Sequence, residues 1–256
     1  MSGQKGELHV GTSGIVVPGN KTTFPIYFRQ KSRLTYYSSL FSSVEINSTF
    51  KKLPNLSTLE RWVMEVPENF YFTIKLWNEI THSKPLTVDI DKISLFLERI
   101  HTLGNKKGCL LIQFPASITN KYFEEVGQIL IALQQADTNN EWRKAIEFRH
   151  TGWYNNNTLE LLNSLQLAIV LHDMPNGENQ KNLSATNFVY ARFHGKKGDY
   201  RGSYDDCFLE EQATKFDRFL RQGKDVYVYF NNTMGEAFKN ATQLRELVQK
   251  RYNENP

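Results

Sequence analysis

The feature that most constrains the fold of this 256-residue chain is a regular alternation of β-rich runs with segments of helical periodicity. The runs are short and rich in apolar, β-branched and aromatic residues, whereas the segments between them carry apolar residues at spacings of three and four. Such alternation is typical of parallel strands joined by crossover helices. The eight predicted strands are residues 8–13, 44–49, 71–77, 109–114, 145–150, 167–173, 188–194 and 226–231.

Eight alternating units favour closure into a TIM-like (β/α)8 barrel over an open, doubly wound sheet. The sixth connection, MPNGENQKNLSAT at 174–186, is polar and marked by Gly and Pro, so we expect the sixth helix to be short or missing. No linker interrupts the chain, and α/β barrels of about 250 residues form one domain. We therefore expect a single barrel domain over residues 1–256. The predicted helices are residues 33–41, 56–66, 91–103, 120–136, 157–166, 208–223 and 235–252.

Composition restricts the class of protein. Hydrophobic residues make up 40% of the chain and charged residues 23%, and no stretch approaches the roughly 20 apolar residues that cross a bilayer. The first residues, MSGQKGELHV, contain no apolar run that would form a secretion signal. The two cysteines, Cys109 and Cys207, are too few for a disulfide framework. We expect a cytoplasmic protein without a membrane partner.

One face of the predicted strands is polar where strands of a parallel barrel are usually apolar. Period-two alternation turns Val44 and Ile46 toward the helices, and it turns Glu45 and Asn47 into the barrel. The polar members crowd the later half of each strand, which forms the carboxyl-terminal mouth where barrel enzymes assemble their active sites. The outward apolar set is Val44, Ile46, Phe72, Ile74, Leu76, Leu110, Ile112, Phe114, Ile146, Phe148, Val189, Ala191, Phe193, Val226, Val228 and Phe230. The inward set is Glu45, Asn47, Thr73, Lys75, Gln113, Glu147, Arg149, Arg192, His194, Tyr229 and Asn231, with Asp173 or His172 from the sixth strand.

This inward set has two interpretations. It can be an internal network of ion pairs, for example Glu147 with Arg149 or Glu45 with Lys75, that only maintains the fold. Buried ion pairs are poor stabilisers, because desolvation costs several kcal/mol per ion and apolar replacements are often at least as stable. A ring of such groups from many strands therefore favours a functional site.

Short motifs follow one another in a fixed order along the chain. They are GTSG at 11–14, VEINSTF at 44–50, ITH at 80–82, QFP at 113–115, IEFRH at 146–150 with Trp153, HD at 172–173, RFHG at 192–195 and YFNN at 229–232. With these motifs the chain closely resembles the YecE-like family, which is catalogued as a domain of unknown function, and the resemblance runs from Gly11 to the last helix. The resemblance implies a TIM-like (β/α)8 barrel and supplies no established reaction.

The mixed charges of the inward set predict an enzyme, a hydrolase or an isomerase/lyase, that acts on a small anionic substrate by acid–base chemistry. Arg149, Arg192 and Lys75 can hold a phosphate or carboxylate. A carboxylate can then act as the base, and a histidine as a proton shuttle, because its ordinary pKa lies near neutrality. The predicted catalytic residues are Glu45, Glu147, Asp173 and His194, and the predicted substrate-binding residues are Asn47, Lys75, Gln113, Arg149, Arg192, Tyr229 and Asn231.

Three other functions use the same groups. A metal-dependent, nuclease-like hydrolase would place an ion on Asp173 and His194, although three nearby cations oppose a divalent ion and we assign no residue to a metal. A glycosidase would pair Glu45 with Glu147. A non-catalytic module would bind a nucleotide or nucleic acid with the loop 195–204, although the net charge of +4 is spread along the chain. No GxxxxGK[ST] or GxGxxG motif is present, so the sequence predicts no particular cofactor.

Overall fold

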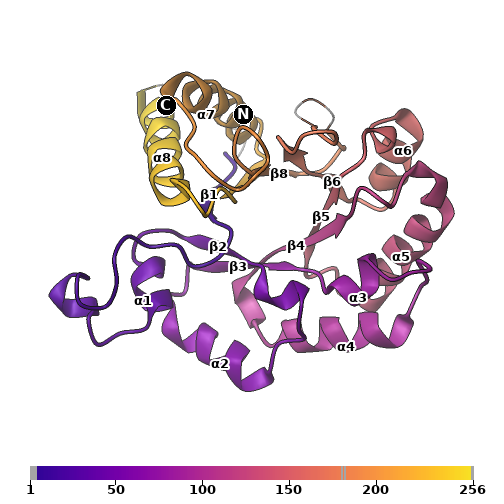
Figure 1. Ribbon diagram of the computed structural model, residues 1–256, viewed down its shortest axis with the longest axis horizontal. Helices are drawn as coiled ribbons and strands as arrows, with labels where there is room; N and C mark the ends of the chain where they lie inside the picture. Colours follow the sequence, from indigo (N-terminus) through magenta and orange to yellow (C-terminus); the bar gives the residue numbers. More distant parts are fainter. Residues whose placement is uncertain (1–4, 180, 182, 255–256) are drawn as a thin grey trace.

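The computed structural model of the chain describes residues 5–179, 181 and 183–254, and these form an α/β fold with two parallel sheets (Figure 1). All eight predicted strands are present, and the sixth is divided into two short strands. The terminal residues of the predicted domain, 1–4 and 255–256, lie outside the described part. The strands are β1 (Leu8–Thr12), β2 (Ser43–Ile46), β3 (Tyr71–Lys75), β4 (Lys107–Phe114), β5 (Arg143–Phe148), β6 (Ala168–Ile169), β7 (Leu171–His172), β8 (Phe188–Phe193) and β9 (Asp225–Phe230).

The helices lie around the strands in Figure 1, and every predicted helix is present. The described residues between β7 and β8 contain no helix, as their polar composition predicts. The sequence does not predict the short helix α3 or the other 3-10 turns, whereas η4 lies within the predicted helix at 120–136. The α-helices are α1 (Arg33–Ser38), α2 (Leu56–Glu65), α3 (Asn78–Thr81), α4 (Ile90–His101), α5 (Phe123–Ala136), α6 (Asn156–Ser164), α7 (Asp206–Arg221) and α8 (Ala237–Glu254). The 3-10 turns are η1 (Ile26–Phe28), η2 (Ser48–Phe50), η3 (Gly104–Lys106), η4 (Asn120–Tyr122) and η5 (Thr151–Trp153).

Side-chain caps fix where three of the longer helices begin. Asp89 precedes α4, Asn155 precedes α6 and Asp205 precedes α7, and each side chain accepts a hydrogen bond from an N–H group of the first helical turn. Such caps satisfy donors that have no partner inside the helix. Within the described part of the chain, none of the helices has the length and apolar character needed to span a membrane.

The two sheets meet where β1 lies beside β2. The strand orders are β1-β9-β8-β7 and β2-β3-β4-β5-β6, and a parallel bridge joins Ser13 to Glu45 between them. The hydroxyl of Tyr37 binds both edges, because it donates to the Ser43 carbonyl at 3.1 Å and accepts from the Thr12 N–H at 2.8 Å. A helix α1 side chain thus connects the first strand of one sheet to the first strand of the other.

The chain also passes directly from one sheet to the other at Val170. Its N–H donates to the carbonyl of Ile146 on β5 at 2.8 Å, which continues the pairing of β6 with β5. The next two residues, Leu171 and His172, form β7 and pair with β8 of the other sheet. This crossing explains why the sixth predicted strand is divided.

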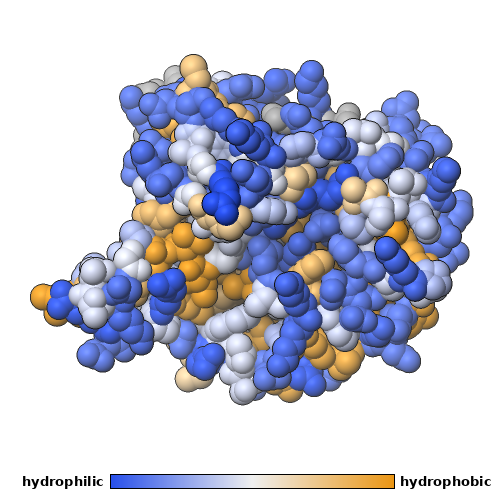
Figure 2. All heavy atoms as spheres, viewed as in Figure 1, coloured by the Kyte–Doolittle hydropathy of each residue, from blue (hydrophilic) through white to orange (hydrophobic). Residues whose placement is uncertain are grey.

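The strands separate two apolar regions, as the alternation predicts. All members of the outward set, from Val44 to Phe230, belong to the main core that the strands share with the helices. A smaller buried cluster faces the other way, and His9 stacks on Tyr227 beside it with ring centroids 4.4 Å apart. Hydrophilic residues cover most of the face shown in Figure 2. The inner cluster consists of Cys109, Leu111, Ala145, Ala168, Val170, Phe188, Tyr190, Tyr227 and Tyr229.

The contact between β1 and β2 can be tested with two Gly→Ala substitutions. A Cβ on Gly11 would lie 2.2 Å from the Ser43 carbonyl oxygen, so Gly11→Ala should lower the free energy of unfolding by about 2 kcal/mol or more. Gly127 lies inside α5, where an added Cβ would meet only Leu161 Cδ2 at 3.8 Å. Gly127→Ala should therefore raise the free energy of unfolding by about 0.5–1 kcal/mol. Urea denaturation measures both, and equal effects of the two variants would contradict this packing.

Candidate functional site

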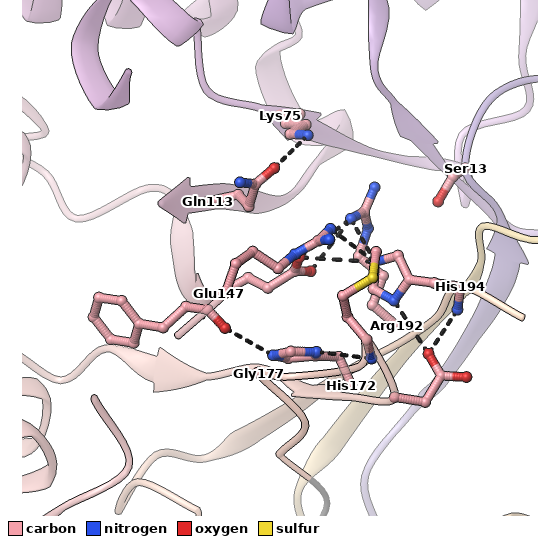
Figure 3. Close-up of polar contacts among 12 residues, drawn as sticks. Ser13, Lys75, Gln113, Glu147, His172, Gly177, Arg192 and His194 are labelled. Atoms are coloured by element: carbon pink, nitrogen blue, oxygen red, sulfur yellow. Dashed lines mark hydrogen bonds and ion pairs between the residues drawn. The ribbon is translucent and has the colours of Figure 1, made fainter. Parts of the chain in front are cut away.

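One guanidinium connects the two sheets at the carboxyl ends of the strands. Arg192 lies on β8 and is 1% exposed, and Figure 3 shows it beside Glu147. Glu45 on β2 and Glu147 on β5 are fully buried. Arg192 Nε donates to both carboxylate oxygens of Glu45 at 3.0 Å, and Nη1 lies 3.3 Å from Glu147 Oε2. A cation of one sheet is thus held between two anions of the other.

Glu45 has no oxygen left for a substrate proton. Its Oε1 accepts from Ser13 Oγ at 2.6 Å and its Oε2 accepts from the Tyr190 hydroxyl at 2.5 Å, in addition to the bonds from Arg192. Burial by itself would raise the pKa of Glu45, but the charge and hydrogen bonds of Arg192, helped by Ser13 and Tyr190, lower the pKa overall. The side chain is therefore an ionised anchor for Arg192.

Glu147 is held in the same way by two arginines. Arg149 Nε donates to Glu147 Oε1, and Arg192 approaches from the other side. Burial opposes the charge of Glu147, yet the two guanidinium groups hold its pKa well below the usual range. Arg149 is less enclosed than Arg192, with 12% of its side chain exposed. Its Nη1 has no hydrogen-bond partner among the described residues.

The contacts of His194 fix its tautomer. Its Nε2 lies 2.9 Å from Arg192 Nη1 and 3.1 Å from Arg149 Nη2, and arginine can only donate. Nε2 must therefore accept, so the ring proton is on Nδ1, which lies 3.2 Å from Asp173 Oδ1. Burial lowers the pKa of His194 even though Glu147 and Asp173 oppose that shift. The imidazole is neutral and its acceptor nitrogen is occupied.

Asp173 is the residue of the sixth strand that joins this network. Its Oδ1 accepts from the His194 backbone N–H at 2.7 Å, and its Oδ2 accepts from the Tyr204 hydroxyl. The alternative, His172, instead supports the following loop. It accepts from the Met174 N–H at 3.2 Å through Nδ1 and lies 3.0 Å from the Phe148 carbonyl through Nε2. Burial lowers the pKa of His172 to about 4, so it stays neutral.

Lys75 lies apart from the network, paired with Gln113 (Figure 3). Its Nζ donates to Gln113 Oε1 at 2.9 Å and lies 4.0 Å from the centroid of the Phe50 ring. Among the described residues, no carboxylate oxygen lies within 4.0 Å of Nζ to form an ion pair. Burial, followed by the nearby charge of Arg192, lowers the pKa of Lys75 to about 7, although Glu147 and Glu45 act in the opposite direction. Far more of this amine is therefore neutral at pH 7 than of an ordinary lysine.

Three further predicted site residues lie outside the network. Tyr229 lies deeper in the fold, where its hydroxyl contacts Ser43 Oγ at 2.5 Å and Thr73 Oγ1 at 2.7 Å. Asn47 follows the end of β2, and its buried Oδ1 has no hydrogen-bond partner in the described part of the chain. Asn231 is 7% exposed and binds Phe193 only through its backbone. The residues that the structure brings together are Glu45, Glu147, Arg149, Asp173, Arg192 and His194 in one network, and Lys75 with Gln113 beside it.

Sequence reasoning missed four residues that complete this arrangement. Tyr190 precedes Arg192 by two positions, so the same alternation would have placed it inward. Ser13 ends the predicted strand at 8–13, one residue after β1, whereas Phe50 ends the VEINSTF motif in the turn η2. Tyr204 comes from the loop before α7, where no periodicity indicates the direction of a side chain.

Several hollows of the described surface lie away from these residues. A cavity of about 550 Å³ opens at the amino-terminal ends of β5 and β8, beside Arg143, Lys144 and Phe188. None of the predicted site residues lines it. We place the candidate site by its chemistry, because the buried charges and the perturbed lysine lie at the opposite ends of the strands.

Comparison with known proteins assigns the chain to a family. Residues 9–256 match the family described as "Protein of unknown function DUF72". The chain belongs to the DUF72 family. This DUF72 chain is 28% identical over 280 residues to the UPF0759 protein YunF of Bacillus subtilis (strain 168), and the match covers 96% of each protein. It is 26% identical over 121 residues to the UPF0759 protein YecE of Escherichia coli (strain K12), which covers 47% of this chain and 43% of YecE. The resemblance to the YecE-like family is thus confirmed.

Solved structures share the fold. A DUF72 family protein from Thermotoga maritima MSB8 aligns with a TM-score of 0.79 at 24% identity, covering 95% of this chain and 99% of the other. A DUF72 family protein from Enterococcus faecalis V583 aligns with a TM-score of 0.77 at 21% identity, and the alignment covers 96% of this chain and 99% of the other. PbGH5A, a glycoside hydrolase family 5 enzyme from Prevotella bryantii B14, aligns with a TM-score of 0.50 at 11% identity, and the alignment covers 98% of this chain and 96% of the other. At these identities the likeness concerns the fold alone.

The contribution of the buried ion pairs of Arg192 to stability can be tested by neutralising the carboxylate of Glu45. Glu45→Gln leaves the buried guanidinium with one carboxylate fewer, and the free energy of unfolding should fall by about 3–5 kcal/mol. The matched control is Glu79→Gln, because Glu79 pairs with Lys92 at 3.4 Å on the exposed surface and should change the stability too little to measure. Urea denaturation at pH 7 compares the two. A Glu45→Gln variant as stable as the control would show that the network contributes nothing to the fold.

Proposed function

We propose that this DUF72 chain is an enzyme that acts on a small substrate bearing a phosphate or carboxylate, by acid–base chemistry at the carboxyl-terminal mouth of a (β/α)8 barrel. We propose further that the barrel is closed and forms one domain over residues 1–256. Two contacts support closure. The Ser13–Glu45 bridge links the sheets at β1 and β2, and the chain itself crosses between them at Val170. The family 5 glycoside hydrolase neighbour supports the same architecture.

The observation that carries the proposal is that two cations at the mouth have donors to spare. Arg149 uses Nε for Glu147 and Nη2 for His194, which leaves Nη1 without a partner in the described part of the chain. Lys75 uses one of its donors for Gln113. Arg192, in contrast, already donates hydrogen bonds to Glu45, to Glu147 and to His194. Arg149 is therefore the anchor for an anionic group, and Arg192 is a positioning residue.

The proton-transfer role falls to Lys75. An efficient general base has a pKa near the working pH. Glu45 and Glu147 have lowered pKa values and are weak bases, and His194 has its acceptor nitrogen occupied by two arginines. Lys75, with a pKa of about 7, is the group at the mouth that can take up and release a proton near neutrality. In this proposal Glu45 and Glu147 position the two arginines. His194, which is oriented by Asp173, accepts hydrogen bonds from the terminal nitrogens of both guanidinium groups.

The paired carboxylates do not favour a glycosidase. That reaction requires one carboxylic acid whose pKa is raised, so that it can protonate the leaving group. Both Glu45 and Glu147 have lowered pKa values and are fully buried. We therefore prefer a substrate that binds to Arg149 over a sugar held between the two glutamates.

A metal-dependent hydrolase is also less well supported than the anion-binding enzyme. Over residues 5–179, 181 and 183–254, no three His, Cys, Asp or Glu side chains are grouped as metal ligands would be. The acceptor nitrogen of His194 faces Arg149 and Arg192, whose charges oppose a divalent ion. The proposal therefore assigns no residue to a metal.

Binding of a simple anion tests the role of Arg149. Inorganic phosphate and acetate should raise the melting temperature of the native chain, because a ligand that binds only the folded state stabilises it. Arg149→Gln should lose at least about 90% of that shift, since it removes the planar donor fork that anions prefer. Arg61→Gln, on the exposed surface of α2, is the control and should keep the full shift. If both variants respond to phosphate like the native chain, Arg149 is not the anchor.

A further inference from the structure

Two buried lysines of this chain differ in what compensates their charge. Lys144 has 1% of its side chain exposed and forms an ion pair with Asp137 at 2.5 Å, supported by Asn140 at 3.3 Å. Lys75 is 9% exposed, yet its partners are the neutral amide of Gln113 and the ring of Phe50. A buried ammonium group without a counterion is costly, and loss of its proton removes that cost. The surroundings of Lys75 thus favour a free amine.

We propose that Lys75 is a covalent nucleophile that forms a Schiff base with the carbonyl group of a small oxo acid whose carboxylate is held by Arg149. The inference rests on the proposed function, because it uses the same anion anchor, and it specifies the substrate class as 2-oxo acids. Buried lysines without a counterion are suited to this chemistry, because the neutral amine is the form that attacks a carbonyl.

The positions of the strands allow one small molecule to contact both residues. Lys75 ends β3, Gln113 lies on β4, and Glu147 on β5 is the register partner of Gln113. Lys75 is level with Leu111 on β4 and with Ala145 on β5, so the backbone of Arg149 lies about 10 Å across the sheet and about 13 Å farther along the strand direction. The two long side chains extend toward one region, because the charge of Arg149 contributes to the lowered pKa of Lys75. The carboxylate and carbonyl carbons of a 2-oxo acid are adjacent, so an acid bound to Arg149 presents its carbonyl close to the anchor.

A second residue indicates that the two cations share one space. The pKa of His82, in the loop after α3, is lowered to about 4 by burial and then by the charges of Lys75 and Arg149. The ring of His82 also meets Phe50 edge to face, with centroids 4.9 Å apart. Phe50 in turn lies under the amine of Lys75. His82 and Phe50 therefore form part of the wall around the amine.

The proposed step is balanced without any further reactant. The neutral Nζ of Lys75 attacks the carbonyl carbon, and a new C–N bond forms as the carbonyl π bond opens. The amine nitrogen gives up both of its hydrogens, the carbonyl oxygen leaves as water, and a C=N bond remains. The imine nitrogen takes up one proton from water, and the resulting iminium withdraws electrons from the neighbouring carbon, so a bond to that carbon can break and later reform. Hydrolysis of the imine returns the free amine.

Reductive trapping tests the inference on the full native chain. The protein is incubated at pH 7 with glyoxylate and sodium cyanoborohydride, and the modified lysines are located and quantified by peptide mass spectrometry. Lys75 should be modified about ten-fold or more faster than Lys144 and than the average surface lysine, because much more of its amine is neutral. Modification spread evenly over the lysines, or absent from Lys75, would overturn the proposal.

Two variants and a second probe separate this inference from the proposed function. Lys75→Met should remove the rapid site without affecting Lys144, and Arg149→Gln should slow modification of Lys75 by about ten-fold through loss of the anchor. Acetone, which lacks a carboxylate, should be trapped poorly at Lys75.

If phosphate binds through Arg149 but glyoxylate does not label Lys75, the Schiff-base proposal is wrong and the anion site stands. If neither occurs, both proposals fail. If Arg149→Gln leaves the labelling of Lys75 unchanged, the oxo acid is not held as proposed.

Discussion

The rest of the structure depends on the guanidinium of Arg192 between Glu45 and Glu147. Removing three charges from water costs several kcal/mol per ion, and that cost is tolerable only where hydrogen bonds satisfy nearly every donor and acceptor. Ser13 and Tyr190 donate the remaining hydrogen bonds to the Glu45 carboxylate, and Arg149 donates a further one to the Glu147 carboxylate. Because these groups come from both sheets, their hydrogen bonds hold the two sheets at one separation at the mouth of the fold.

The same bonds determine the state of the groups around them. The carboxylates that Arg192 and Arg149 engage are not available to Lys75 as a counterion, so burial, followed by the charge of Arg192, lowers the pKa of its amine to about 7. Below that pH the buried ammonium destabilises the folded chain, and the penalty fades as pH rises toward the ordinary lysine pKa of about 10.4. A chain selected only for stability would gain by replacing this lysine with an apolar residue. Its retention beside a partly exposed Arg149 fits a role in binding or chemistry.

The sequence predicts the strands and their faces well, because a period of two and burial by helices act on every strand alike. Glu45, Glu147, Arg192 and His194 meet as that period implies, and the suggested Glu147–Arg149 ion pair is present. The suggested ion pair between Glu45 and Lys75 does not form. Alternation predicts the side of the sheet on which a side chain lies, but it does not predict which residue across the fold the side chain contacts. Glu45 instead pairs with Arg192, which is 147 residues away in the chain.

Depth and loops are the other limits of prediction. Tyr229 shares the inward face of β9 but lies below the charged network, at the level of Ser43 and Thr73. Asn47 was predicted from a strand that in fact ends at Ile46 and turns into η2. Tyr204 reaches the network from the loop before α7, where turn geometry and long-range packing decide the direction of a side chain. No local pattern carries that information.

The most direct test of the account is the pKa of the Lys75 amine, measured by NMR titration of ¹³C-labelled lysine side chains in the native protein. The network predicts one lysine signal that titrates near pH 7 and disappears in Lys75→Met, whereas exposed lysines titrate near 10.4. Lysine signals that all titrate near or above pH 10 would contradict the claim that the arginine-held carboxylates leave this amine without a counterion.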